Sequence, residues 1–432
     1  MSKNTILSVL ILLFVSLSAG AQRYDVLDQV KADWRKAAAM EGPHRFDAPA
    51  LSKAPKGYKP FYISHYGRHG SRYAWSSKTY TQLRDILSQA HQEQALTPLG
   101  EEFYENYMAF YEVPLINTGD LVPLGFEQHK RIGEWAYDSF PEVFRKDRHV
   151  DAIVSTAPRS IVSMSSFCLS LQKKNPKLDI FQSSNHTGLT VATPTSAPKP
   201  LLRQFKEDDI SRVESVSHFN HRFLDFDGLL GRIFKDPDYP SQFSGGRTNF
   251  LQQCYQLIGG YHNYEDRPLF DNLFTTDQMA MLWEADNYAS FYADLTARYG
   301  NIPLLEDVID KAEKAFENSS QAADLRFGHD YVLEAFMCLI NANGCGTVPE
   351  KASEVKYWFQ SYNIPMAATM MFVFYKDRKD DILFKLIWNE AEATLPQLTP
   401  VQGPYYRWAD FKAWAEQMMA AHPEVEQKEG DN

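Results

Sequence analysis

The sequence predicts an α/β fold, with a mostly parallel central sheet flanked by helices and an inserted, mainly helical cap domain. Two observations predict this class. A short apolar run, a polar turn and a stretch of helical periodicity follow one another three times, starting at residues 61–63, 151–156 and 323–327. Strands that alternate with helices are typical of parallel sheets. Before the third unit, residues 199–303 are aromatic-rich and largely helical in pattern.

The first of these units contains the most informative stretch of the chain. Its apolar run suits a buried strand, and Ser76 suits the N-cap of a helix over residues 79–87. Residues 64–72 lie between them and read Ser-His-Tyr-Gly-Arg-His-Gly-Ser-Arg. We interpret this stretch, in which two arginines flank a histidine on a glycine-containing turn, as a loop that grips phosphate.

Prolines mark the starts of several later helices. Pro98 and Pro123 suit first helical positions, and helical spacing continues from them to near Glu112 and Asp138. In the second unit the strand breaks at Pro158, and a helix is expected over residues 159–171. A further strand is expected at residues 178–182.

The third unit follows the helical insertion. Pro303 suits the start of a helix over residues 304–317, and the strand at 323–327 leads through Gly328-His329-Asp330 into a helix closed by Gly344. Residues 365–375 and 382–388 are expected to form further buried strands.

The expected domain organisation follows from these elements. Residues 1–21 have Lys3 near their start, an apolar run and Ala-Gly-Ala at their end, as in a secretory signal peptide. The α/β core is expected over 22–198 and 304–432, and the cap over 199–303. No cysteine follows the cleavage site and no later apolar run reaches about 18 residues, so neither a lipid anchor nor a membrane span is expected. We therefore expect a periplasmic or secreted protein.

Composition limits the classes of partner. The formal net charge is −11, which is unfavourable for nucleic-acid binding because that binding neutralises many phosphates. Any anion must therefore meet a local positive cluster. The four cysteines are too few for a disulfide scaffold, although Cys338 and Cys345 are close enough in sequence for a local bridge, which stays open.

Charged and titratable side chains stand at the turns of all three units. They are Arg68, His69, Arg72, Arg159, His329 and Asp330. Turns that follow parallel strands meet at one edge of the sheet, so we expect these side chains to converge. Arginine forks suit the oxygens of a phosphate, and helix N-termini add donors.

This convergence indicates phosphoester chemistry. A histidine between two arginines can attack phosphorus through a ring nitrogen and form a phosphohistidine that water then hydrolyses. The leaving alkoxide needs a proton, for which Asp330 is the best candidate. A bound phosphate would raise the pKa of that carboxyl by like-charge repulsion. Asp330 could equally be a helix N-cap, and Arg159 an exposed residue at a helix start.

Two signatures carry a family resemblance. Arg68-His69-Gly70-Ser71-Arg72 resembles the N-terminal signature of the histidine acid phosphatases, and Gly328-His329-Asp330 resembles the C-terminal one. Other parts of the chain resemble the family in the right order: Val122-Pro123-Leu124-Gly125 with Gln128, Ser155-Thr156 with Arg159 and Ser163, and the stretch from Lys385 with Asn389-Glu390. The resemblance covers nearly the whole mature chain.

The resemblance implies an α/β core with a helical cap, no metal or other cofactor, and a small phosphorylated substrate. It implies His69 as nucleophile, Asp330 as proton donor, and the side chains of Arg68, Arg72, Arg159 and His329 as phosphate ligands. Within the family the chain is most similar to the multiple inositol polyphosphate phosphatase and phytase group. Inositol polyphosphates such as phytate are therefore the expected substrates.

Two departures from the family pattern bear on specificity. The inositol polyphosphate branch usually has Glu two places after the second histidine, whereas Asp330 follows His329 directly. Ala74 stands where the signature commonly has Pro. Residues just past this loop, including Lys78, are expected near the pocket for the leaving group.

Three alternatives stay open. A sugar-phosphate or broad-specificity acid phosphatase would use the same site. A protein that binds phosphorylated ligands without turning them over would also keep it. A metal-dependent hydrolase built on His65, His69 and His329 is less favoured because the strand and Gly67 argue against a helical His pair. We expect His65 to be structural.

Overall fold

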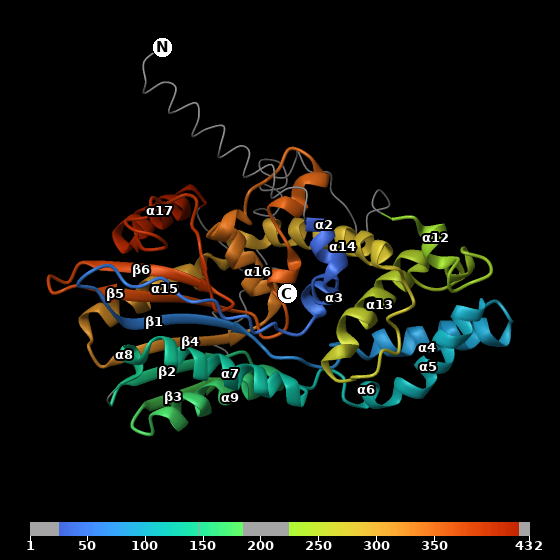
Figure 1. Cartoon of the computed structure of the whole chain (residues 1–432), viewed down its shortest axis with the longest axis horizontal. Coiled ribbons are helices and arrows are strands. Elements are labelled where there is room, and N and C mark those ends of the chain that lie inside the picture. Colours follow the sequence, from blue (N-terminus) through green and yellow to red (C-terminus); the bar gives the residue numbers. More distant parts are fainter. Residues whose placement is uncertain (1–25, 146, 185–223, 423–432) are drawn as a thin grey trace, which may run out of the picture.

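A computed structural model describes residues 26–145, 147–184 and 224–422 (Figure 1). The expected signal peptide at 1–21 and the first part of the expected cap, up to residue 223, lie outside the described residues. Within them, no helix combines the length and apolar character that a membrane crossing requires.

The centre of the described part of the chain is a mixed sheet of eight strands, which confirms the α/β class (Figure 1). The main path of the sheet has the order β3-β2-β4-β1-β5-β6-β7, and β8 pairs with β6. The strands β3, β2, β4 and β1 pair in parallel, and the pairings from β1 to β5 onward are antiparallel. Their bounds are β1 Lys59–Arg68, β2 His149–Val154, β3 Asp179–Ser184, β4 Gln321–Gly328, β5 Thr369–Lys376, β6 Ile382–Trp388, β7 Ala391–Ala393 and β8 Tyr406–Arg407.

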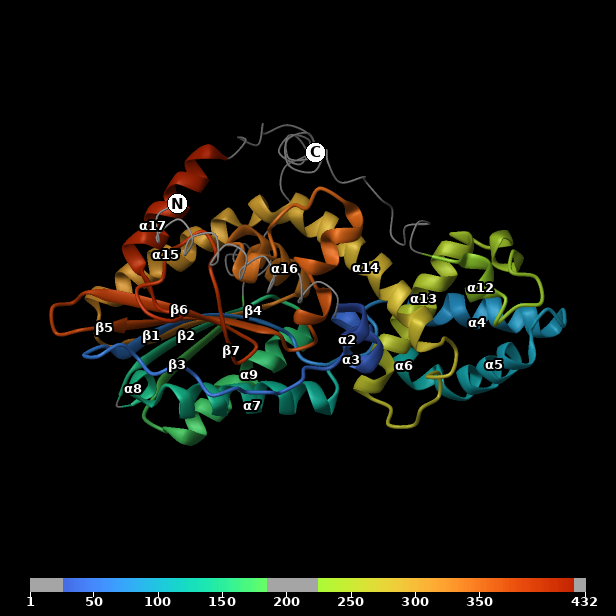
Figure 2. The same ribbon diagram turned by 45° about the horizontal axis from the view of Figure 1, so that its top comes forward.

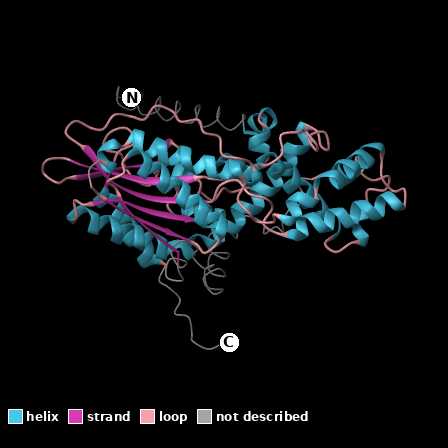
Figure 3. Ribbon diagram, turned by 90° about the horizontal axis from the view of Figure 1, so that it is seen from below, coloured by secondary structure: helices cyan, strands magenta, loops and turns pink. Residues whose placement is uncertain are grey.

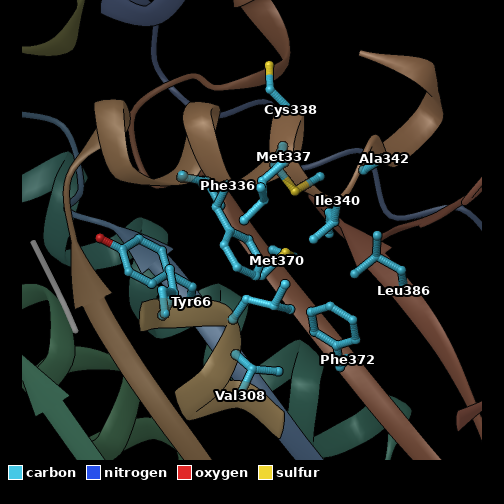
Figure 4. Packing of buried hydrophobic residues seen from close by; sticks show 14 of the residues in the cluster. Tyr66, Val308, Phe336, Met337, Cys338, Ile340, Ala342, Met370, Phe372 and Leu386 are labelled. Atoms are coloured by element: carbon cyan, nitrogen blue, oxygen red, sulfur yellow. The ribbon is translucent and has the colours of Figure 1, made fainter. Parts of the chain in front are cut away.

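Helices cover both faces of the sheet, as Figure 2 shows. One face carries α7 (Pro123–Ser139), α8 (Pro141–Phe144) and α9 (Pro158–Lys174), and the other carries α15 (Ile302–Glu317), α16 (Asp330–Leu339) and α17 (Trp408–Ala421). Two hydrophobic clusters, one on each face, make up this part of the core. In Figure 4, Phe336 points from α16 toward Met370 and Phe372 of β5, whereas Cys338 points to the opposite side of the helix.

A lobe built only from helices lies beside the sheet (Figure 3). It combines α4 (Ser77–Gln92), α5 (Pro98–Phe110) and α6 (Glu112–Ile116) with α12 (Phe226–Leu230), α13 (Gly246–Gly260) and α14 (Thr276–Ala297), next to α2 (Val26–Ala32) and α3 (Trp34–Ala37). One hydrophobic cluster includes buried residues of α2, α4, α5, α12, α13 and α14 and Ala37 of α3, and Leu115 of α6 packs against it. Residues 77–116, expected in the α/β core, thus pack with the helical lobe. The boundaries of the cap stay a prediction.

The expected strand, turn and helix units are present, with differences at their ends. Strand β1 continues to Arg68, well beyond the apolar run at residues 61–63, because its buried neighbours β4 and β5 supply backbone partners. The end of α16 differs from the expectation. Asn341, with φ of 50°, takes the left-handed position after the helix, and Gly344 lies in the next turn.

The sequence left open whether Cys338 and Cys345 form a disulfide, and the structure shows that they do not. All four are free and buried. The thiol of Cys338 lies 3.7 Å from the carbonyl oxygen of Cys345, so these residues are neighbours without a disulfide.

Candidate active site

Strand β1 delivers Arg68 and His69 to the carboxyl edge of the sheet. Arg68 is in register with Gly328 at the end of β4, and Val154 ends β2 beside Phe327. The backbone N–H of His69 donates to the carbonyl of Gly328 at 3.0 Å. The three strand-to-helix turns of the prediction therefore meet at one edge.

Two glycines allow the loop after His69 to lie against α7. A Cβ atom on Gly70 would stand 2.4 Å from the carbonyl oxygen of Gly125, and one on Gly125 would stand 2.4 Å from that of Ser71. Side chains of α7 and α9 then hold the loop, since Gly70 N–H donates to Ser163 Oγ at 3.0 Å and Ser71 N–H donates to Gln128 Oε1 at 2.9 Å. These contacts give a structural reason for the family-like residues of both helices.

The ring of His69 is buried and its orientation is fixed. Its Nδ1 lies 2.9 Å from the carbonyl oxygen of Gly70, which can only accept, so Nδ1 carries the proton and Nε2 keeps its lone pair. Burial, followed by the charges of Arg72, Arg68 and Arg159, holds the pKa of His69 well below 6.5. The imidazole is therefore neutral at acidic to neutral pH.

Arg68 is the most firmly held cation of the site. Its fully buried guanidinium donates to the carbonyls of Met40 at 2.7 Å and Ile364 at 2.8 Å, and to Asp330 Oδ2 at 2.6 Å. Its position is thus set by three separate segments of the chain.

Arg72 and Arg159 approach His69 from the loop and from α9. Arg72 donates to the carbonyl of Tyr73 at 3.0 Å and lies 3.8 Å from Glu41 Oε1. Arg159 is the second residue of α9, and its buried Nε has no hydrogen-bond partner. Burial and the charge of Arg72 lower the pKa of Arg159, which indicates that cations crowd a small space. Such a space favours a multiply charged anion.

His329 completes the cluster around His69. Its ring centroid lies 5.6 Å from that of His69, and its backbone N–H donates to the hydroxyl of Tyr66 at 3.2 Å. Burial, then the charges of Arg159 and Arg68, lower the pKa of His329 to about 4. The ring is therefore a neutral hydrogen-bonding group above that pH.

Asp330 begins helix α16 and is tied to Arg68. Its Oδ1 accepts the backbone N–H of Tyr331 at 2.9 Å. Burial alone would raise the pKa of Asp330, but the charges of Arg68 and Arg72 and the Tyr331 N–H lower it to about 2. The carboxyl is thus ionised at pH 5 in this arrangement. It can become a proton donor only when an anion competes for the arginines.

A pocket adjoins the cluster of arginines and histidines around His69, on the side of Arg72. Its lining includes Glu41, Ala74, Trp75 and Tyr264, and 65% of the Trp75 surface is exposed at its rim. The backbone at Ala74 is held without a proline, because its N–H donates to the hydroxyl of Tyr80 at 2.9 Å and its carbonyl accepts from Gly119 at 2.9 Å. The exposed Lys78 stands on the first turn of α4 and is not part of this lining.

His65 lies apart from these groups. Its ring packs on Phe167 at 5.1 Å and Phe327 at 4.9 Å between centroids, and burial holds its pKa well below 6.5. Among the residues that the structure describes, no three His, Cys, Asp or Glu side chains are grouped so as to hold a metal ion.

Three residues that contact the site, His129, Asn263 and Glu41, were not predicted from the sequence. His129 of α7 is buried with Nε2 2.8 Å from the carbonyl of Arg68, and burial lowers its pKa to about 3. Asn263 lies with Oδ1 2.6 Å from Ser71 Oγ, and Nδ2 donates to the carbonyl of Glu41 at 2.8 Å. For His129 the adjacent Gln128 was a signal, whereas Asn263 and Glu41 have no motif around them.

No protein-family model matches the sequence, and no curated protein matches it either. Among solved structures, the multiple inositol polyphosphate phosphatase of Bifidobacterium longum, in complex with inositol hexasulfate, is similar with a TM-score of 0.74 and 19% identity. The match covers 91% of this chain and 99% of that one.

Two phytases are also similar. The enzyme of D. castellii matches with a TM-score of 0.67 and 14% identity over 92% of this chain and 88% of that one. The Hafnia alvei phytase matches with a TM-score of 0.58 and 14% identity over 85% of this chain and 98% of that one. The resemblance to histidine acid phosphatases inferred from the signatures is thus confirmed at the level of the fold, and this chain has the fold of the multiple inositol polyphosphate phosphatases and phytases.

Proposed function

We propose that this protein is a histidine acid phosphatase that hydrolyses phosphate monoesters through a phosphohistidine on His69, with inositol polyphosphates as substrates. One observation carries the proposal. The cations Arg68, Arg72 and Arg159 and the ring of His329 all lie close to the buried His69. This set can bind a phosphate and attack it.

In the first step, Nε2 of His69 attacks phosphorus while the three arginines hold the phosphate oxygens. The N–P bond forms as the ester P–O bond breaks, and the arginines stabilise the charge on the transferring group. The lowered pKa of His69 keeps its lone pair available. Asp330 gives its proton to the leaving oxygen, which departs as an alcohol.

In the second step, water attacks the phosphohistidine and breaks the N–P bond. Asp330, now a carboxylate, takes the proton of that water, and inorganic phosphate is released. Bound phosphate competes with Asp330 for Arg68, whose Nη2 lies 2.6 Å from Oδ2 of Asp330. The substrate itself thereby favours the protonated acid that the first step needs.

The substrate class rests on similarity and on the pocket beside Arg72. The similar structures are named as phytases and as an inositol polyphosphate phosphatase, and two of them hold inositol hexasulfate or myo-inositol hexakis sulphate. The lining of the pocket includes Trp75, whose exposed ring can contact the carbon face of a cyclic leaving group. A sugar phosphate could use the same surface, which makes sugar-phosphate hydrolysis the second candidate.

The location of the enzyme is part of the proposal. A signal peptide at residues 1–21 would send the mature chain, beginning at Gln22, to the periplasm or the exterior. Detection of the mature chain in periplasmic extracts, with Gln22 as its first residue, tests this part.

Phosphate release across pH tests the function. The panel is phytate, glucose phosphate and an aryl phosphate, with wild type and His69→Ala compared. The proposal expects release by wild type, fastest with phytate, and a loss of at least about 1,000-fold in His69→Ala. Tight phosphate or vanadate binding without any release identifies the non-catalytic alternative, and loss of activity on chelation identifies the metal-dependent one.

A further inference from the structure

The two-residue turn Asn389-Glu390, which joins β6 to β7, has no part in the mechanism above. Trp388 and Ala391 pair across it, and both residues of the turn have left-handed backbone, with φ of 48° for Asn389 and 61° for Glu390. Asn and Gly are common in such turns, whereas a left-handed Glu is unusual. The side chain of Glu390 is also fully buried. Strained backbone that carries a buried charged side chain points to a role beyond joining two strands.

Asn389 fastens both ends of the segment 363–369. Its Nδ2 donates to the carbonyl of Asn363 at 2.7 Å, and its Oδ1 accepts the backbone N–H of Thr369 at 3.0 Å. The backbone N–H of Asn389 also donates to the carbonyl of Thr369 at 2.9 Å. Trp388 Nε1 adds a second donor to the carbonyl of Asn363, at 3.0 Å. The first and last residues of the segment are therefore held by the end of β6 and the turn after it.

The inner residues of this segment hold Arg68 and His69. The carbonyl of Ile364 accepts Nη1 of Arg68 at 2.8 Å, and the carbonyl of Ala368 accepts the backbone N–H of Arg68 at 2.9 Å. The backbone N–H of Ala367 donates to the carbonyl of His69 at 2.9 Å. Three backbone groups of one segment thus contact the proposed nucleophile and one proposed phosphate ligand.

Glu390 fastens a second segment that holds Arg68. Its Oε2 lies 2.8 Å from Nε2 of His44, whose side chain is 2% exposed. The carbonyl of Met40, four residues before His44, accepts Nη1 of Arg68 at 2.7 Å. Each of the two carbonyl groups that hold Nη1 therefore belongs to a segment that one residue of the turn fastens.

We propose that Asn389 and Glu390 are positioning residues that fix the guanidinium of Arg68 for phosphate binding and transfer. Asn389 acts through the segment that carries the carbonyl of Ile364, and Glu390 acts through the segment that carries the carbonyl of Met40. The inference rests on the proposed function, in which Arg68 is a phosphate ligand.

The physical reason is preorganisation. An arginine has a long flexible side chain, so holding it in one place costs conformational entropy unless other groups already fix it. Two carbonyl acceptors on Nη1 of Arg68 orient the guanidinium before any substrate binds. A donor that is already oriented stabilises the transferring phosphoryl group without further rearrangement, and a misplacement of about 1 Å can lower a rate about 100-fold.

The test replaces Asn389 by Gly, which accepts the left-handed backbone but removes both side-chain hydrogen bonds. We expect kcat for p-nitrophenyl phosphate to fall about tenfold or more. The Ki of orthovanadate, whose five-coordinate complex resembles the transferring phosphoryl group, should rise about tenfold, and the Ki of inorganic phosphate about threefold. Asn389→Asp keeps the acceptor for the N–H of Thr369 and loses the donor to Asn363. It should show smaller changes of the same kind, and it serves if the glycine variant does not fold.

The Glu390 side of the turn is tested by a pair of variants. Glu390→Gly accepts the left-handed backbone and loses the contact with His44, so kcat should fall about tenfold. Glu390→Gln keeps an oxygen that can accept a hydrogen bond from His44 and should stay within about threefold of wild type. Equal losses in the two variants would overturn this part of the inference.

A matched control separates positioning from stability. Asn343 also has left-handed backbone, with φ of 52°, and its Oδ1 accepts the backbone N–H of Thr394 at 2.7 Å. Asn343→Gly removes a comparable contact away from the site, and should leave kcat and both Ki values unchanged. In the Arg68→Ala background, Asn389→Gly should lower kcat less than threefold, because the group that it positions is gone.

Two results would overturn the inference. One is an equal fold loss from Asn389→Gly with and without Arg68, and the other is an unchanged ratio of the vanadate Ki to the phosphate Ki in the folded variant. Absence of phosphate release from wild type would instead reject the proposed function. The affinity for inorganic phosphate, measured by calorimetry, then decides the positioning role: about threefold weaker binding by Asn389→Gly supports it, and unchanged binding overturns it.

Discussion

The Nη2 atom of Arg68 lies 2.6 Å from Oδ2 of Asp330, which joins a proposed phosphate ligand from β1 to the proposed acid from α16. This Arg68–Asp330 ion pair couples the binding of phosphate to the protonation of Asp330. Any phosphate oxygen that draws the guanidinium away from Asp330 removes the main charge that lowers the pKa of that carboxyl to about 2. Binding of the dianion therefore raises the proton affinity of the acid, which is the order that catalysis needs.

Replacing the acid should affect esters in proportion to their need for a proton. Asp330→Asn keeps the size of the side chain and a partner for the Tyr331 N–H but donates no proton to the leaving oxygen. We expect kcat for an alkyl phosphate to fall about 100- to 10,000-fold, and kcat for p-nitrophenyl phosphate to fall much less. Steady-state kinetics on both esters measures the difference. Equal losses would mean that Asp330 serves binding or structure instead.

The acidic limb of activity should respond to Arg72. In the proposed mechanism His69 attacks in its neutral form, so kcat/KM should rise as the pH rises through the pKa of His69. After burial, Arg72 is the strongest influence that lowers this pKa. Arg72→Gln should therefore raise it and move the acidic limb to higher pH by about 0.5 to 1 unit, besides weakening phosphate binding. Arg84→Gln, which removes a cation on the surface of α4, serves as the control, and a limb that stays in place in Arg72→Gln would contradict the assignment.

The contact between the loop after His69 and α7 should tolerate no side chain at Gly125. In Gly125→Ala the new Cβ would stand 2.4 Å from the carbonyl oxygen of Ser71, so either the loop or the helix must shift. We expect a loss of about 1–3 kcal/mol in the free energy of unfolding, measured by urea denaturation. Gly260→Ala is the matched control, because its Cβ would meet nothing closer than 3.8 Å. Equal free energies of unfolding for the two variants would show that Gly125 and the Ser71 carbonyl are farther apart than the structure has them.

The exposed ring at the pocket rim should contribute to substrate binding. Trp75→Ala removes the most exposed aromatic surface beside Arg72, so KM for phytate and glucose phosphate should rise about three- to tenfold with little change in kcat. Lys78→Ala, at the nearby exposed position predicted from the sequence, provides the comparison. A rise in KM for phytate alone in Lys78→Ala would assign that lysine to a second phosphate group. Unchanged KM values in Trp75→Ala would place the leaving group elsewhere.

Local sequence patterns predicted the part of the site that lies on the strand-to-helix turns. Arg68 and His69, Arg159, and His329 with Asp330 each follow a recognisable strand, and the rule that parallel strands share a carboxyl edge brought them together. The convergence seen around His69 agrees with that reasoning. The roles of these residues in catalysis stay predictions until activity is measured.

Other parts depend on contacts between distant segments and left no local pattern. The helices over residues 77–116 pack with α12–α14 through apolar surfaces whose partner cannot be read from periodicity. Asn263 contacts Ser71, and Glu41 lies near Arg72, although both are far in sequence from the loop after His69.

The central claim is that His69 becomes phosphorylated during turnover. Rapid quenching of wild type with ³²P-labelled phytate or p-nitrophenyl phosphate, followed by peptide mapping, tests it most directly. The account predicts a label that is stable in alkali, labile in acid and located on the peptide that contains His69, with none in His69→Ala. Rapid phosphate release by His69→Ala, or turnover of wild type with the label on another residue, would contradict it.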